Sequence, residues 1–318
     1  MYRVDFGDVA SAMVQIFLIG VAGFLFVRKK FMDESGLRLL AKLLVNFFWP
    51  NYVFFHLTQQ FHFQEYPRWW IFPLLSLTIT AAGMGIGRAL LSFFPWANQR
   101  KEIMALVAFQ NSGFLPLMLA STIFPAMEAQ QLTIYILIFL VGFDLSIWTM
   151  GVWFLHGRQE GHFDSKWLLN PPFLAIVMTL LFIALGGQKI LPHSLMRATE
   201  MLSQCALPMA LLTVGGSLAA LKVEQVSKRA VLGAVFAKLI VMPLLAFFFI
   251  EGLRLEFWMG FLILLQSVVP SAITLSILAR HYKGIDEQFI NQGLLFSHIL
   301  SLLTIPAFLS WYLHVRLG

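Results

Sequence analysis

The chain has 318 residues, of which 59% are hydrophobic and 12% are charged, against roughly 45–50% and about 25% in soluble domains. This composition excludes an ordinary soluble enzyme, and the single cysteine, Cys205, excludes an internal disulfide and a cysteine metal cluster. The net charge of +6 does not indicate nucleic-acid binding, because the basic residues are spread over the loops between apolar segments.

Ten apolar stretches are each close to the ~20 residues that cross a bilayer. In chain order they cover residues 9–27, 37–57, 69–93, 103–124, 132–155, 169–185, 199–221, 230–250, 257–279 and 290–313. The loops between them are short and leave no room for a separate soluble domain. We therefore predict an all-α polytopic membrane protein with ten transmembrane helices.

The positive charge is divided unevenly between the two sides of the membrane. Ten crossings place both termini on one side, and the loops and helix ends on the other side carry 15 of the 22 lysines and arginines. The side richer in Lys and Arg is normally cytoplasmic. We predict that both termini lie outside the cytoplasm, in a cell or inner membrane.

Proline motifs recur at a spacing of about half the chain. Segment 2 contains Asn46 and Pro50, and segment 7 contains Pro208 in a similar setting, so these three residues are expected to mark kinks. The spacing from Gly113 in segment 4 to Pro270 in segment 9 is nearly the same. These offsets predict an internal duplication.

Two halves of five helices each, residues 1–160 and 161–318, must have opposite orientations because five is odd. Such an inverted repeat is common among alternating-access carriers. Coincidence is the alternative, because proline is frequent in membrane helices, and Pro73 and Pro243 do not follow the same offset.

Segments 4 and 9 each carry helix-breaking residues near their middle, at 109–116 and 266–274. Pro116 and Pro270 each remove a backbone donor, and Gly113 adds backbone freedom. Backbone can open at this depth only where it is buried in protein or lines a wet cavity. Two breaks at matching positions are the best sequence indication of a transporter's binding site.

The breaks also supply groups that bind ions. Each creates a half-helix N-terminus with a partial positive charge, which suits a carboxylate, while the opposite ends suit a cation. Polar side chains that could complete the site are Gln110, Asn111, Gln266, Ser271 and Thr274. The alternative is a structural kink satisfied by neighbouring side chains.

Ionisable residues inside the spans are few, and each is a functional hypothesis by default. Asp144 could carry a coupling proton, or pair with Lys238 or His298. Lys238 could attract an anion, and His298 could donate to a backbone carbonyl. With so few acids and histidines in the spans, we predict no catalytic group, no metal site and no intramembrane enzyme.

The motifs resemble those of the auxin efflux carrier family, in its short microbial form. Residues 111–117 resemble the family's segment-4 signature, and 270–272 followed by 279–282 resemble its segment-9 signature. Pro208 with Leu211, Leu212 and Gly215 resembles the segment-7 pattern; residues 170–172, and Lys238 with Pro243, fit segments 6 and 8. Two departures are Pro116, where many members have glycine, and Thr274, near which many have asparagine.

The resemblance implies the ten-helix inverted-repeat fold of PIN proteins and bile-acid transporters, in which the broken helices 4 and 9 cross. Segments 1, 2, 6 and 7 would form a scaffold, and segments 3–5 and 8–10 the moving part. Family members move organic anions, among them auxin, malate and malonate.

We therefore expect a secondary active transporter of small mono- or dicarboxylates, with no cofactor beyond H⁺ or Na⁺ coupling. Its binding residues would be Asn111, Gly113, Pro116, Gln110, Gln266, Pro270, Ser271 and Thr274. Its partners would be the anion and the lipid bilayer, with no nucleic acid, and a homodimer is left open. The alternatives are a Na⁺-coupled organic-anion symporter of the bile-acid type and a non-transporting membrane sensor.

Overall fold

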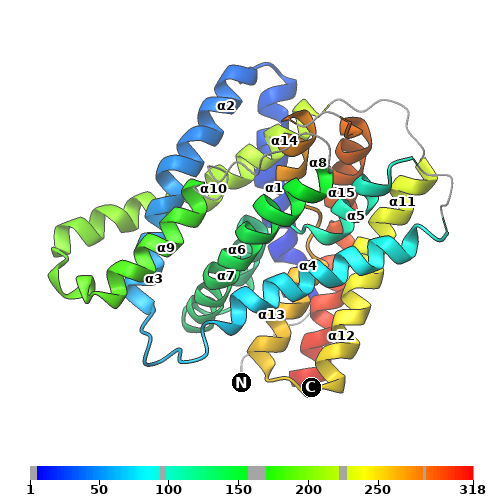
Figure 1. Ribbon diagram of the computed structural model, residues 1–318. Coiled ribbons are helices and arrows are strands. Elements are labelled where there is room, and N and C mark those ends of the chain that lie inside the picture. The colour runs from blue at the N-terminus through cyan, green and yellow to red at the C-terminus, as the bar shows by residue number, and fades with distance from the viewer. Residues whose placement is uncertain (1–5, 94–97, 157–169, 222–227, 282–283, 318) are drawn as a thin grey trace.

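The structure is a computed structural model that describes residues 6–93, 98–156, 170–221, 228–281 and 284–317. These residues are helical apart from short connections and two breaks (Figure 1). The boundary expected between residues 160 and 161 lies outside the described part of the chain.

The described helices follow one another along the chain with few long connections. They are α1 (Phe6–Arg28), α2 (Glu34–Leu43), α3 (Trp49–Gln60), α4 (Ile71–Leu90), α5 (Arg100–Ala108), α6 (Phe114–Ile123), α7 (Ala126–Ser146), α8 (Val152–His156), α9 (Pro171–Ala184), α10 (His193–Ala220), α11 (Lys228–Phe236), α12 (Met242–Gly252), α13 (Phe257–Val268), α14 (Thr274–His281) and α15 (Glu287–Leu317).

Six described helical stretches are long and apolar enough to cross a membrane. They are Phe6–Arg28, Ile71–Leu90, Ala126–Gly151, His193–Ala220, Arg229–Gly252 and Glu287–Arg316. Three shorter apolar helices, α6, α9 and α13, accompany them. The expectation of an all-helical membrane protein is therefore confirmed.

Several long helices are widened by a single π-turn. One π-turn, Leu44–Phe48, joins α2 to α3 just before Pro50, and another, Ala237–Val241, joins α11 to α12 just before Pro243. A wider turn relieves the clash between a proline ring and the carbonyl four residues back. Pro208, by contrast, lies inside the continuous helix α10, so Pro50 and Pro208 have different local structures.

Asn46 lies within the first of these π-turns and is exposed. Its side-chain Nδ2 donates to the Lys42 carbonyl, at 2.8 Å. This bond gives a partner to a backbone carbonyl close to the π-turn.

The helices pack in two groups. In one group α1 lies along α10, and α3 contacts α9 and α10. In the other, α4 contacts α5 and α7, while α15 contacts α11 and α13. Figure 1 shows α2, α3, α9 and α10 on the left, and α5, α11, α12 and α15 on the right. Contacts of α1 with α6 and α15 join the two groups.

A close contact between α1 and α10 holds the first group together. A Cβ atom added at Gly215 would overlap the carbonyl oxygen of Gly20, and one added at Gly23 would overlap the Leu212 carbonyl. Backbone contact of this kind needs small residues, which are typical of helix interfaces in membranes. Glycine is therefore required at 215 and 23 by lack of space.

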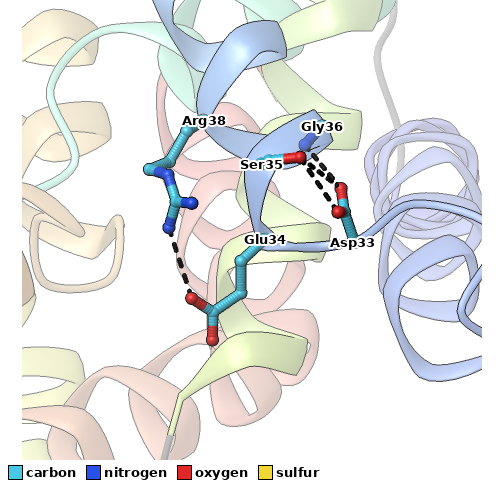
Figure 2. A network of polar contacts seen from close by, with 5 residues as sticks. All are labelled: Asp33, Glu34, Ser35, Gly36 and Arg38. Carbon is cyan, nitrogen blue, oxygen red and sulfur yellow. Dashed lines mark hydrogen bonds and ion pairs between the residues drawn. The ribbon is translucent and has the colours of Figure 1, made fainter.

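The start of α2 is fixed by a capping network (Figure 2). Gly36 N donates to Asp33 Oδ1 at 2.8 Å, and Ser35 Oγ donates to both carboxylate oxygens at 2.9 Å. These bonds, the one from Gly36 first, hold the pKa of Asp33 below its usual range. Since this pKa is lower in the folded chain, the cap stabilises the helix at neutral pH and is lost as the pH falls through that lowered value.

The α1–α10 contact generates a paired prediction. Gly215→Ala should destabilise the protein by about 1–3 kcal/mol, the usual cost of overpacking, and lower its melting temperature in detergent. Gly20→Ala is the matched control, because a Cβ atom at Gly20 meets nothing within 4 Å. Equal melting temperatures for the two variants would contradict the contact.

Candidate functional site

Two apolar helical segments are interrupted at the expected positions. Helix α5 ends at Ala108 and α6 begins at Phe114, while α13 ends at Val268 and α14 begins at Thr274. The two intervening stretches cross, and Gln110 pairs with Ser271 in an antiparallel bridge. The structure therefore brings the two sequence-predicted breaks into direct contact.

Backbone hydrogen bonds join the two breaks. Asn111 N donates to the Pro270 carbonyl at 2.8 Å, and Ala272 N donates to the Phe109 carbonyl at 2.9 Å. Each bond gives a partner to one donor and one acceptor that the interrupted helices leave open. Each break thus supplies hydrogen-bond partners for backbone groups of the other.

Side chains from the second break add bonds to the first. Ser271 Oγ donates to the Leu106 carbonyl, in the last turn of α5, at 2.6 Å. Gln266 Nε2 donates to the Ser112 carbonyl at 3.2 Å. All four residues are buried, so these bonds give partners to carbonyls that water does not reach.

Four half-helix ends meet at this crossing. Helices α6 and α14 bring N-termini, and α5 and α13 bring C-termini. Gly113 is the N-cap of α6, and Pro116 is buried in its first turn. The N–H groups in the first turn of a helix have no partner within that helix. Pro116, which has no N–H, therefore removes no helical hydrogen bond from α6, and the break precedes it in the chain.

The crossing also contains buried amides without partners. Neither Oε1 nor Nε2 of Gln110 forms a hydrogen bond in the described structure, and Gln266 Oε1 forms none either. Both side chains are fully buried, and an unpaired buried amide costs about 1–3 kcal/mol per group. Asn111, Gly113 and Thr274 are only partly buried, so they form the accessible edge of the crossing.

The three ionisable residues occupy separate helices. Lys238 is fully buried in the π-turn Ala237–Val241, and its Nζ has no hydrogen-bond partner. Asp144 on α7 is partly buried, and no ion pair joins it to Lys238 or His298 among the described residues. His298 Nδ1 contacts the Leu294 carbonyl at 2.8 Å, as expected for a donor to the backbone.

Polar contacts connect the helices around the second break. Ser276 Oγ on α14 donates to Asn291 Oδ1 on α15 at 2.8 Å. At the start of α15, Asp286 accepts from Gln99 Nε2 at 2.9 Å, and Asp286 N donates to Glu102 Oε1 at 2.9 Å. The starts of α5 and α15 and the second half of the broken helix therefore form one bonded unit.

Sequence reasoning did not single out Ser76 and Thr80. Both lie on α4, four residues apart and therefore on one face, and both hydroxyls are buried without a partner. Two hydroxyl residues four positions apart in an apolar segment are the sequence pattern that could have indicated them. No cluster of metal-binding side chains occurs among the residues described.

A bundle of membrane-length helices with two interrupted helices that cross through open backbone is the architecture of a membrane transporter. The family model of membrane transport proteins matches residues 8–309, and the chain belongs to this auxin efflux carrier-like family of transporters. Members of the family are transporters and not enzymes. A search of curated proteins found no match.

The crossing can be tested through its serines. Ser271→Ala removes the bond to the Leu106 carbonyl and should cost about 1–3 kcal/mol, because a buried acceptor is left unpaired. Ser267→Ala is the matched control: it is equally buried, but its hydroxyl bonds the Ile263 carbonyl within its own helix. Thermal unfolding in detergent should show the larger loss for Ser271→Ala, and the reverse order would contradict the assignment.

Proposed function

We propose that the protein is a secondary active carrier of small organic anions, namely mono- or dicarboxylates such as malate, malonate or an auxin-like acid. The observation that carries this proposal is the crossing itself. Two half-helix N-termini, the unpaired amide of Gln110 and the unpaired Oε1 of Gln266 lie there, in a chain that belongs to a transporter family. Helix N-termini and amide donors suit a carboxylate.

The residues of the crossing divide into contact and framework roles. Asn111 and Thr274, which are partly exposed, would meet the carboxylate at the edge beside Gly113. The amides of Gln110 and Gln266 would complete the polar shell. Ser271, Pro270 and Pro116 would shape the backbone, because the Ser271 hydroxyl and the Pro270 carbonyl already have partners.

Alternating access would come from motion of one helix group against the other. In this proposal ten spans form two inverted repeats, 1–160 and 161–318, in a cell or inner membrane with both termini outside. Helix α1 begins and α15 ends toward the same edge of Figure 1, as an even number of crossings requires. The bonds that connect α5, α14 and α15 support their moving together.

Energy coupling would use an ionisable residue within the apolar segments. Asp144 has neither an ion pair nor a hydrogen bond among the described contacts, so its carboxylate is available to bind and release a proton. Lys238 and His298 are secondary candidates, each with an unpaired nitrogen.

A Na⁺-coupled symporter of the bile-acid type is the second candidate. The half-helix C-termini of α5 and α13 favour it, because carbonyl groups at helix ends suit a cation. Uptake that requires Na⁺ at constant pH would select this alternative.

Asn111→Ala tests the binding site. We expect uptake of labelled malate and malonate into proteoliposomes to fall at least tenfold, which corresponds to about 1.4 kcal/mol, because an amide partner of the carboxylate is lost. Asn51→Ala is the control, since the Asn51 side chain bonds the Phe47 carbonyl of its own helix. Unchanged affinity and rate in Asn111→Ala would refute this site.

Asp144→Asn tests proton coupling, because it keeps the shape of the side chain and removes the titrating group. Uptake driven by a pH gradient should be lost, whereas exchange of labelled for unlabelled substrate at equal pH should persist. Full gradient-driven uptake in this variant would eliminate Asp144 as the proton carrier.

A further inference from the structure

A cavity lies apart from the residues of the crossing. It has a volume of about 990 Å³ and lies between the end of α3, the 3₁₀ turn Gly187–Ile190, the first half of α10 and the start of α7. None of the residues assigned above to the crossing lines it. The cavity is therefore a separate feature that the proposed carrier site does not use.

Helix α10 presents a polar row to this cavity. His193, Arg197, Glu200 and Gln204 all line it, and their spacing places them on one face of the helix. Gln204 is about 16 Å along the helix from His193, at ~1.5 Å per residue. The row begins before the apolar stretch 199–221 that is expected to cross the membrane, and Glu200 and Gln204 continue it into the first turns of that stretch. Polar side chains there require water or polar partners.

The opposite wall is held in place by hydrogen bonds. Gln188 Nε2 donates to the carbonyls of Thr58 and Phe61, at 2.7 and 3.2 Å, and so fixes the 3₁₀ turn on the end of α3. Gln60 Nε2 approaches His56 Nδ1 at 3.5 Å, while Gln60 Oε1 is buried without a partner.

The charges in the cavity define the chemistry of a ligand. Arg197 and Glu200 both line it, and neither forms an ion pair within the described chain. A guanidinium binds a carboxylate, and a carboxylate and an amide oxygen accept from a hydroxyl or an ammonium group. A small molecule that carries both kinds of group matches both residues.

We propose that this cavity is a water-filled vestibule that docks a small hydroxy- or amino-carboxylate. The ligand's carboxylate binds Arg197, and its hydroxyl or ammonium group donates to Glu200. The choice of ligand class rests on the proposed carrier function. The vestibule would hold the substrate before or after it occupies the crossing.

The single cysteine supplies the first test. Cys205 is exposed on α10 beside Gln204 but does not line the cavity. In nanodiscs, a charged methanethiosulfonate should modify Gln204→Cys, made in a Cys205→Ser background, at least tenfold faster than it modifies native Cys205. Equal rates would overturn the vestibule, because both thiols would then share one environment.

Ligand protection supplies the second test. Malate should slow modification of the Gln204→Cys thiol, and succinate, which lacks the hydroxyl, should slow it less. Arg197→Gln should abolish protection without changing the rate measured in the absence of malate. Absence of protection, or protection that survives Arg197→Gln, would overturn the docking site.

Asn111→Ala separates the two sites. Protection that persists in this variant while uptake is lost supports a vestibule distinct from the crossing. Protection lost in Asn111→Ala but kept in Arg197→Gln would overturn the vestibule and leave the carrier function standing. Protection of a protein that transports neither malate nor malonate would instead refute the carrier function and retain the vestibule.

Discussion

Open backbone at membrane depth must find hydrogen-bond partners, because lipid supplies none. Here each broken helix supplies the partners of the other, through the bonds from Asn111 N to the Pro270 carbonyl and from Ala272 N to the Phe109 carbonyl. Without the other break, neither would have partners for these backbone groups. The two halves of the chain must therefore associate before either interrupted helix is stable in a membrane, and the rest of the bundle is arranged around that association.

The helices within one group are held together by a different kind of contact from the helices within the other. Helices α1 and α10 meet backbone to backbone at Gly20 and Gly215, where Gly215 has no room for an added methyl group. Around the second break the helices are joined by polar side chains such as Ser276 and Asn291. A fit fixed by shape resists sliding, whereas hydrogen bonds that lie within one group let that group move as a unit.

The sequence predicts those parts of the structure that depend on local chemistry. Proline and glycine act on their own helix, so the breaks could be located from the pattern alone. The sequence does not predict features that depend on which helices become neighbours. Pro116 falls in the first turn of a new helix, Asp144 and Lys238 do not pair, and Gln110 is buried without a partner. Each outcome is decided by tertiary packing, which cannot be predicted from the spacing of residues along the chain.

The bridge at the crossing is made by the main chain, and this separates the frame of the site from its chemistry. The backbone bonds of Asn111 and Ala272 would form with almost any side chain at those positions, proline excepted. Residues at the edge of the crossing can therefore be exchanged in the course of evolution without dismantling the frame that presents them. Diversification of cargo within such a scaffold would require only point changes, while the crossing itself is inherited intact.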